Sequence, residues 1–303
     1  MNPPSDDSGA AIDALVGGVT RRTINRGNRV LTWLEAGSAS PSVVFEAGAM
    51  SPVVGFAAVF KALAPDHHLI AYDRAGYGGS TPVPLDLNLQ LGDLIAVLEQ
   101  AGPSIIVGHS WGGLLAQLAT WNRPDLVTGL VLLDPAHEVF WQELTADERA
   151  AMGRRPDRTR PASADSRYDD VVAFGHELAE DVVRSVDTAV PVGELLRQAC
   201  LSYLQTDEQL LAYLDELPMI LEHLDDLAAY RASAVWPSVP VVLLTATKGR
   251  PEKFTPRVIA VQEELAAQAR GRHLVVPDSG HYLQLDRPDL VVECVREVSR
   301  RRE

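Results

Sequence analysis

The sequence has few cysteines and no excess of basic residues. Its two cysteines, Cys200 and Cys294, stand far apart in a chain of 303 residues and form no C-x-x-C pair. A disulfide framework or a cysteine metal site is therefore not expected, and both are predicted to be small buried hydrophobes. Basic residues number 27 against 41 acidic ones, a formal net charge of -14. Because nucleic-acid affinity depends on clustered Lys and Arg, this balance argues against a nucleic acid as partner.

Long hydrophobic runs are also missing. No stretch of the sequence approaches the roughly 20 apolar residues that span a bilayer, so no membrane partner is expected. Residues 1–18 carry acidic side chains where a secretory signal needs basic and then apolar residues, which predicts a cytoplasmic protein with reduced thiols. The sequence contains no H-E-x-x-H and no phosphate-binding loop, so neither a metal nor an organic cofactor is expected.

Short runs rich in β-branched residues alternate with helical patterns over most of the chain. This alternation is typical of an α/β fold, with a mostly parallel central sheet covered by helices on both faces. After Asp134 the alternation stops, and helical periodicity alone continues until the next apolar run, which predicts an inserted all-helical cap. The expected parts are a flexible leader (1–18), a core in two segments (19–136 and 235–303) and the helical cap (137–234).

One short motif suggests catalysis. Gly108–Gly112 reads G-x-S-x-G, with the apolar run Ile105–Val107 before it and a helical pattern directly after it. A serine on such a strand-to-helix turn is a nucleophile elbow, because the glycines beside it allow strand and helix to approach closely. The same turn directs the free amides of the helix N-terminus at the serine, where they stabilise negative charge. Ser110 is the candidate nucleophile; the alternative is a structural serine in a glycine-rich turn.

A serine hydroxyl needs a base to remove its proton, and His281 is the candidate. It lies in "DSGHYLQL", just after the last predicted strand. Groups that act on ligands gather at the carboxyl ends of the strands in such sheets, so this loop can meet Ser110. The neighbouring His109 is expected to point away from the serine hydroxyl. Five other histidines are predicted to be surface or packing residues (His67 and His68) or structural residues of the cap (His137, His176 and His223).

These motifs together resemble the α/β-hydrolase family over nearly the whole chain outside the leader. The matching segments are "FEAGAM", "DRAGYGGS", "GHSWGG", the cap-sized insertion and "DSGHYLQLDRPDLV". The family implies the chain order serine, acid, histidine, with two backbone amides that bind the oxyanion. Carried over, these amides belong to Trp111 and Ala49, with Met50 as the neighbour to consider. This sequence has "EAG" where many relatives have His-Gly, so Ala49 is the less secure donor.

The acid departs from the usual family pattern. In most members it follows the strand that here reads "VPVVLLTATKGRPEKF", where the available carboxylate is Glu252. Some members supply the acid at the end of the preceding core strand, which here is Asp134. Asp134 is the preferred acid, Glu252 the alternative and Glu138 a third choice. A purely structural role for Asp134, as a turn former before Pro135, also stays open.

The resemblance implies acyl transfer to water. Epoxide and haloalkane hydrolysis in this family needs an aspartate at the elbow, so Ser110 argues against both. Phe140 and Trp141, together with Met50 and the Trp111 side chain, are predicted to line an apolar substrate pocket. The expected partner is thus a small apolar ester or lactone. The alternatives are a carbon–carbon bond hydrolase, a haloperoxidase-like enzyme on the same residues, or a member of the fold that binds a ligand without turnover.

Overall fold

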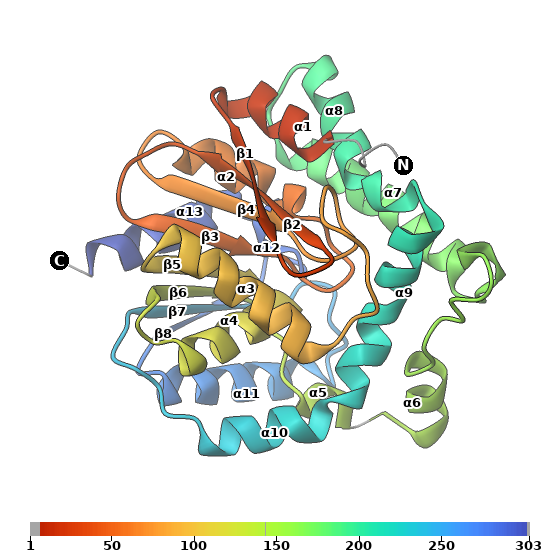
Figure 1. Ribbon diagram of the computed structural model, residues 1–303. Helices are drawn as coiled ribbons and strands as arrows, with labels where there is room; N and C mark the ends of the chain where they lie inside the picture. Colours follow the sequence, from red (N-terminus) through yellow and green to blue (C-terminus); the bar gives the residue numbers. More distant parts are fainter. Residues whose placement is uncertain (1–6, 143, 302–303) are drawn as a thin grey trace.

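The structure is a computed structural model that describes residues 7–142 and 144–301. Its strands are β1 (Thr20–Asn25), β2 (Val30–Ala36), β3 (Ser42–Glu46), β4 (His68–Asp73), β5 (Ser104–His109), β6 (Val127–Leu133), β7 (Val241–Ala246) and β8 (Arg272–Val276). In the described residues they form a single sheet in the order β1-β2-β4-β3-β5-β6-β7-β8 (Figure 1). The hairpin β1–β2 and the pair β2–β4 are antiparallel, and all other neighbours are parallel. The predicted fold class is confirmed.

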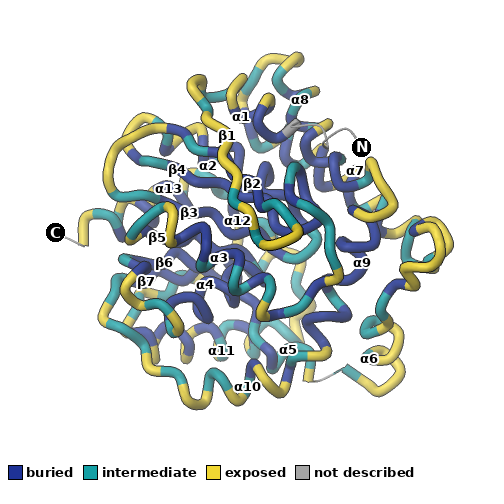
Figure 2. Tube along the Cα trace, viewed as in Figure 1, coloured by how far each residue is buried: buried dark blue, intermediate teal, exposed yellow. Residues whose placement is uncertain are grey.

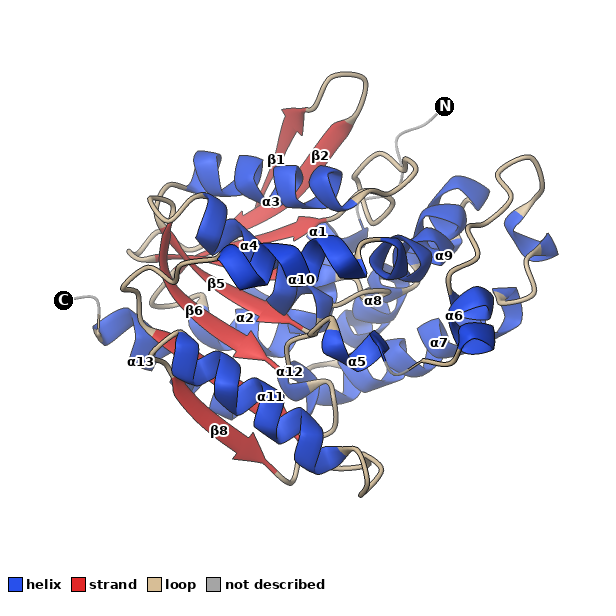
Figure 3. Cartoon of the chain, turned by 90° about the horizontal axis from the view of Figure 1, so that it is seen from below, coloured by secondary structure: helices blue, strands red, loops and turns tan. Residues whose placement is uncertain are grey.

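The helices cover the sheet on both faces. They are α1 (Asp7–Val16), α2 (Ala57–Leu63), α3 (Leu87–Ala101), α4 (Trp111–Asn122), α5 (Val139–Gln142), α6 (Ala146–Met152), α7 (Tyr168–Ser185), α8 (Val190–Cys200), α9 (Asp207–Glu222), α10 (Leu224–Ser233), α11 (Thr255–Gln268), α12 (Leu283–Asp286) and α13 (Pro288–Arg300). Helices α3, α4, α10 and α11 pack against one face, and α1, α2, α12 and α13 lie on the other, as the view from below shows (Figure 3).

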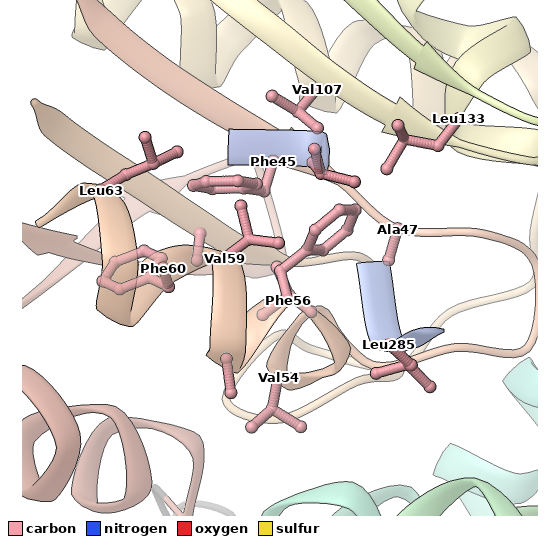
Figure 4. Packing of buried hydrophobic residues seen from close by; sticks show 14 of the residues in the cluster. Phe45, Ala47, Val54, Phe56, Val59, Phe60, Leu63, Val107, Leu133 and Leu285 are labelled. Carbon is pink, nitrogen blue, oxygen red and sulfur yellow. The ribbon is translucent and has the colours of Figure 1, made fainter. Parts of the chain in front are cut away.

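Side chains of the central strands alternate between the two hydrophobic cores. In β3, Val43 and Phe45 belong to the core on the α2 side, whereas Val44 belongs to the core under α3 and α4. Phe45 packs on Phe56 and Phe60, with ring centroids 5.1 and 5.6 Å apart (Figure 4). Both faces of β3 are therefore shielded from water. Burial on both faces explains why the central parallel strands appear in the sequence as continuous apolar runs.

The described residues of segment 137–234 contain helices and no strand. Helix α9 is buried along most of its length, whereas α6 is largely exposed (Figure 2). Helices α7 and α8 contribute to the same core as α2, and α10 contributes to the core under α4. Helices α7 and α8 are thus packed on one side of the sheet and α10 on the other, and α9 lies between α8 and α10 in the chain.

The expected flexible leader is corrected for Asp7–Val16. These residues form helix α1, in which Ala11 and Ile12 are fully buried against α8 and α2. Leu15 and Val16 pack against the same core, and the spacing of the four places them on one helix face. This apolar face gives the helix a partner surface, so the segment is ordered from Asp7 onward. The first part of the expected leader, residues 1–6, lies outside the described residues.

Three smaller features concern the cysteines, membrane-spanning helices and metal sites. Cys200 and Cys294 are both buried and free, as predicted from their spacing. Within the described part of the chain, none of the helices is both long and apolar enough to span a bilayer. In the same residues, His, Cys, Asp and Glu side chains do not gather in groups that could hold a metal ion.

Candidate active site

Ser110 stands on a strained turn between β5 and α4. Its backbone has φ 51° and ψ -117°, a conformation that a non-glycine residue adopts only when its surroundings enforce it. The amide of Ser110 donates to Leu133 O at 3.0 Å, which ties the turn to the end of β6. A Cβ on Gly112 would lie 2.3 Å from the carbonyl oxygens of Glu46 and Ala47. The glycine therefore allows α4 to begin directly against the end of β3.

Two backbone segments meet beside Ser110. Trp111 is the first residue of α4, so its amide has no acceptor within the helix and faces the turn. The loop after β3 approaches from the other side, where a Cβ placed on Gly48 would lie 3.3 Å from Ser110 Cβ. The amide that follows Gly48 belongs to Ala49. Both amides named by the family resemblance thus come from segments next to the serine.

Met50 is excluded as an oxyanion donor. Its backbone has φ 54°, and its amide donates a 2.5 Å hydrogen bond to Oε2 of Glu216, on helix α9. An amide that is already bound to a carboxylate cannot donate to a substrate oxyanion. The side chain of Met50 packs beside the buried tyrosines Tyr77, Tyr203 and Tyr213.

His281 and Asp134 are in direct contact. Nδ1 of His281 lies 2.5 Å from Oδ2 of Asp134, whose side chain is completely buried, whereas the imidazole is 43% exposed. Asp134 directly follows β6 and has φ 44°. Its loop is tied to the elbow, because the amide of Ala136 donates to Ser110 O at 2.8 Å. The carboxylate therefore lies behind the histidine, and both lie at the strand ends where Ser110 stands.

The two other carboxylates considered from the sequence lie elsewhere. Glu252 is exposed in the loop after β7, while Nδ1 of His281 is directed at Asp134. Glu138 is buried in an ion pair with Arg231, which donates to both of its oxygens at 2.8 and 3.1 Å. This geometry favours Asp134 over both alternatives.

The chain matches a family model described as the alpha/beta hydrolase family over residues 37–294. It belongs to the alpha/beta hydrolase family. This match spans Ser110, the loop after β3, Asp134 and His281, and leaves out α1 and the β1–β2 hairpin. The chain is therefore a hydrolase-family protein, and hydrolase chemistry is supported for the arrangement described above.

Characterised relatives of the hydrolase are distant. It is 36% identical over 103 residues to lipase LipV of Mycobacterium tuberculosis, which covers 33% of the hydrolase and 39% of the lipase. It is 23% identical over 249 residues to epoxide hydrolase 3 of Xenopus tropicalis, which covers 76% of the hydrolase and 64% of that relative. The matched stretches thus span less than two thirds of either relative.

Solved structures of low sequence identity share the fold of the hydrolase. The Cif epoxide hydrolase from Acinetobacter nosocomialis superposes with a TM-score of 0.71 at 19% identity, covering 98% of the hydrolase and 97% of that chain. Cfl2 from Burkholderia cenocepacia superposes with a TM-score of 0.64 at 20% identity, covering 93% and 96%. Because each superposition covers more than nine tenths of both chains, the likeness extends to the inserted helices of segment 137–234.

Sequence reasoning missed two further partners of Asp134 in the hydrolase. Arg250 follows β7, the place where most family members have the acid, and its Nη2 contacts Oδ2 of Asp134. Gln262, on α11, donates from Nε2 to Oδ1 of Asp134 at 3.2 Å and to Pro135 O at 2.9 Å. The buried carboxylate is thus hydrogen-bonded at both oxygens, which offsets part of its desolvation cost. The arginine in "TKGRPEKF" was the available sequence signal for the first of these.

His109 has contacts that the sequence did not predict. Its ring lies 4.7 Å, centroid to centroid, from that of His281, and its Nε2 lies 2.9 Å from the His281 carbonyl oxygen. Burial, together with the neighbouring His281, holds the pKa of His109 well below its usual range, so His109 is neutral and donates from Nε2. The residue before the nucleophile therefore supports the loop that presents His281.

The aromatic residues predicted for the pocket have different environments. The Trp111 side chain is 1% exposed and its Nε1 donates to Gln90 on α3 at 2.7 Å, so its indole is part of the interior and does not line a pocket. Phe140 is half-buried and packs edge-on against Phe254, with ring centroids 5.8 Å apart. Trp141 is half-buried against the core under α4.

A buried cluster of charged residues contacts the loop after β3, and sequence reasoning gave it no role. Arg74 at the end of β4 is paired with Glu46 at the end of β3 and with Glu216 on α9, at 2.9 and 2.8 Å. All three side chains are at most 3% exposed. The sequence signals were the Arg of "DRAGYGG" and the Glu of "FEAG", but only the fold brings Glu216 to them.

Glu46 should make the stability of the hydrolase depend on pH. Burial raises the pKa of its carboxyl from 4.5 to about 7, against the lowering effect of Arg74. The folded state therefore binds this proton more tightly than the unfolded chain does. The resulting stabilisation is complete below pH 4.5 and is lost as the pH rises to about 7. At about 1.36 kcal/mol per pKa unit, the loss amounts to about 3 kcal/mol.

Urea unfolding of the wild type and of Glu46→Gln, at about pH 5 and about pH 8, measures this contribution. The free energy of unfolding of the variant minus that of the wild type should be about 2–3 kcal/mol larger at about pH 8 than at about pH 5, because only the wild type loses stability as the pH rises. An identical pH dependence in the two proteins would show that Glu46 does not titrate in this range.

Proposed function

We propose that the hydrolase cleaves a carboxylic ester or lactone of a small apolar molecule through an acyl-enzyme on Ser110. The main support is the contact between Nδ1 of His281 and the buried Asp134, next to a serine held in a nucleophile elbow. The ring of His281 also packs on His109, the residue before Ser110. Serine, histidine and aspartate thus come together in the chain order that the family implies.

The proposed reaction follows from the arrangement of these side chains. Asp134 accepts from Nδ1–H of His281, so Nε2 is the nitrogen left to take the proton of Ser110 as its Oγ attacks the carbonyl carbon. The amides of Trp111 and Ala49 donate to the oxyanion that develops on the carbonyl oxygen. His281 then protonates the leaving alcohol. In the second half it takes a proton from water, which attacks the acyl carbon, and it returns that proton to Ser110 Oγ as the bond between the acyl carbon and Oγ breaks and the acid is released.

The serine nucleophile supports an acyl substrate over the epoxides named for two of the relatives. Those likenesses lie below 25% identity, so they concern the fold rather than the chemistry. Met50, Phe140 and Trp141 are the proposed substrate contacts. Met50 lies beside a cluster of buried tyrosines, and the other two are half-buried aromatics, so apolar acyl groups are the favoured class.

A fluorophosphonate probe tests the nucleophile. Folded wild-type protein should form a covalent adduct that peptide mapping assigns to Ser110. Ser110→Ala should give no adduct, and His281→Ala should react at least about 10³-fold more slowly, because its serine lacks a base. An unlabelled Ser110 in folded wild-type protein would contradict the proposal.

A panel of nitrophenyl esters of rising acyl length, with several lactones beside it, tests the substrate class. We expect kcat/KM to rise with acyl length until the apolar pocket is filled, by up to about tenfold per two methylenes. Phe140→Ala should shift the preferred length without changing the rate of probe labelling. Labelling of Ser110 with no turnover of any ester or lactone would instead favour carbon–carbon bond hydrolysis or ligand binding.

A further inference from the structure

We propose that Glu216, a fully buried residue of cap helix α9, is a positioning residue that holds both oxyanion-binding amides. The inference rests on the proposed function, since it assigns Glu216 a role in that reaction. Glu216 contacts neither Ser110 nor His281 by any hydrogen bond within the described residues. It acts through two series of hydrogen bonds, which we call arms: the first runs to the peptide that carries the Ala49 amide, and the second runs to Trp111.

The first arm reaches the loop after β3. Oε2 of Glu216 accepts the Met50 amide at 2.5 Å and the hydroxyl of Tyr77 at 2.9 Å. Met50 directly follows Ala49, and its left-handed backbone is held by this bond. The carboxylate of a cap helix thus ties down the residue next to the oxyanion donor.

Arg74 extends this arm to the peptide unit that carries the donor. Its Nε donates to Oε1 of Glu216 at 3.0 Å, and its Nη2 donates to Gly48 O at 2.5 Å. The Gly48 carbonyl and the Ala49 amide belong to one planar trans peptide, so they point in opposite directions. Fixing the carbonyl on Arg74 therefore directs the Ala49 amide away from the cluster. A Cβ on Gly48 would touch Ser110 Cβ, which locates this peptide beside the nucleophile.

The second arm reaches α4. Gln90, buried on α3, donates from Nε2 to Oε1 of Glu216 at 3.0 Å. Its Oε1 accepts the indole Nε1–H of Trp111 at 2.7 Å. Trp111 supplies the other proposed oxyanion amide, and its indole is held in the interior by this bond. One carboxylate therefore fixes the first residue of α4 and the loop that faces it.

A glutamine cannot reproduce these bonds. The carboxylate of Glu216 accepts at both oxygens, and an amide would place an NH₂ group at one of them. At Oε2 the NH₂ would meet the Met50 amide, which cannot turn to accept. At Oε1 it would meet Arg74, which has donors only, and Gln90, whose amide is already oriented by the Trp111 indole. Glu216→Gln is nearly equal in volume, so it changes the hydrogen bonds while leaving the packing almost intact.

The neighbouring Asp215 gives a matched control on the same helix. It is also buried, and it pairs with Arg155 and Arg158 at 2.9 Å and accepts the Leu85 amide at 2.8 Å. It thus fastens α9 to other segments by bonds of the same kind. None of these bonds leads to Ser110 or to the oxyanion amides, so Asp215→Asn should lower stability and leave turnover nearly unchanged.

The experiment compares the wild type, Glu216→Gln and Asp215→Asn on one ester substrate and one boronic acid. A boronic acid forms a tetrahedral adduct with the serine, so its affinity reports the oxyanion amides. Displacement of these amides should lower kcat of Glu216→Gln by about 10- to 100-fold, with KM within about threefold of the wild type. Boronic-acid affinity should fall in proportion to kcat. Asp215→Asn should keep both within about threefold of the wild type.

Gln90→Met removes only the hydrogen bonds that link Glu216 to Trp111. It is the variant to measure if Glu216→Gln does not fold. It should lower kcat by about tenfold and weaken boronic-acid binding to match. Wild-type kcat and boronic-acid affinity in whichever of these variants is folded would overturn the role of Glu216. An equal loss of kcat in Asp215→Asn would also overturn it. The loss would then come from any weakening of the packing of α9 against the rest of the protein, and not from the bonds of Glu216. Failure of the proposed function would appear separately, as a wild type that neither hydrolyses the ester nor binds the boronic acid.

Discussion

Replacing Asp134 by Asn should lower kcat by about 10⁴-fold and leave the fold in place. The carboxylate lies 2.5 Å from Nδ1 of His281 and is fully buried, so its charge acts on the histidine with little screening by water. Without that charge, the imidazolium that forms when Ser110 gives up its proton has no counterion. Arg250, which also contacts Oδ2 of Asp134, would remain as an unopposed positive charge nearby.

The backbone at this position makes Asn a clean substitution. Asp134 has φ 44°, and Asn is the residue besides Gly and Asp that adopts such angles most readily. The far-ultraviolet circular dichroism spectrum should therefore match that of the wild type. Steady-state kinetics on a nitrophenyl ester then isolates the loss of the charge.

Glu252→Gln is the control for this prediction. Glu252 was the alternative acid, and it lies exposed in the same loop as Arg250. The variant should keep kcat within about twofold of the wild type, as surface changes usually do. Near-normal turnover in Asp134→Asn, combined with a large loss in Glu252→Gln, would transfer the role of acid to Glu252.

Gly112→Ala should destabilise the hydrolase by about 3 kcal/mol and almost abolish labelling of Ser110. The added methyl group would lie 2.3 Å from the carbonyl oxygens of Glu46 and Ala47. Both contacts are backbone atoms, which cannot move aside as a flexible side chain can. Helix α4 or the end of β3 would have to move, and either movement separates Ser110 from the Ala49 amide.

Gly55→Ala is the matched control, because a Cβ on this buried glycine would meet nothing within 4 Å and its φ is not positive. It should change the free energy of unfolding by less than about 1 kcal/mol. Urea unfolding and the rate of fluorophosphonate labelling measure both variants. Wild-type stability and labelling in Gly112→Ala would show that the close approach of α4 to β3 is not required.

The features that the sequence predicted correctly are those that local pattern determines. Strands β3, β5, β6 and β7 are buried along almost their whole length, and each carries an apolar run that reads as a strand without reference to its neighbours. The elbow is similarly local, since its strand, glycines and helix lie within fifteen residues. Asp134, named from the family resemblance, and His281, named from its position after the last strand, are brought into contact by the sheet order, while their catalytic roles stay predictions.

The features that could not be predicted from the sequence depend on contacts between segments that are far apart in the chain. Glu216 stands in "YLDELPM", where a carboxylate on a helix is ordinarily a solvated residue, and only the tertiary fold places it on Arg74. Arg250 looked like one of several exposed charges after β7. Helix α1 was missed for a related reason, because a short amphipathic segment has no stable structure until α8 provides the surface it covers.

That dependence of α1 on α8 has a consequence for the order of folding. Along the chain, Asp7–Val16 precedes its main partner, Val190–Cys200, by more than 170 residues. Helix α1 therefore has no docking surface until α8 has been made, and closing so long a loop is slow. Contacts between α1 and α8 should form among the last steps of folding. In hydrogen exchange, the amides of α1 should accordingly open before those of β5 and β6, which have neighbours on both sides.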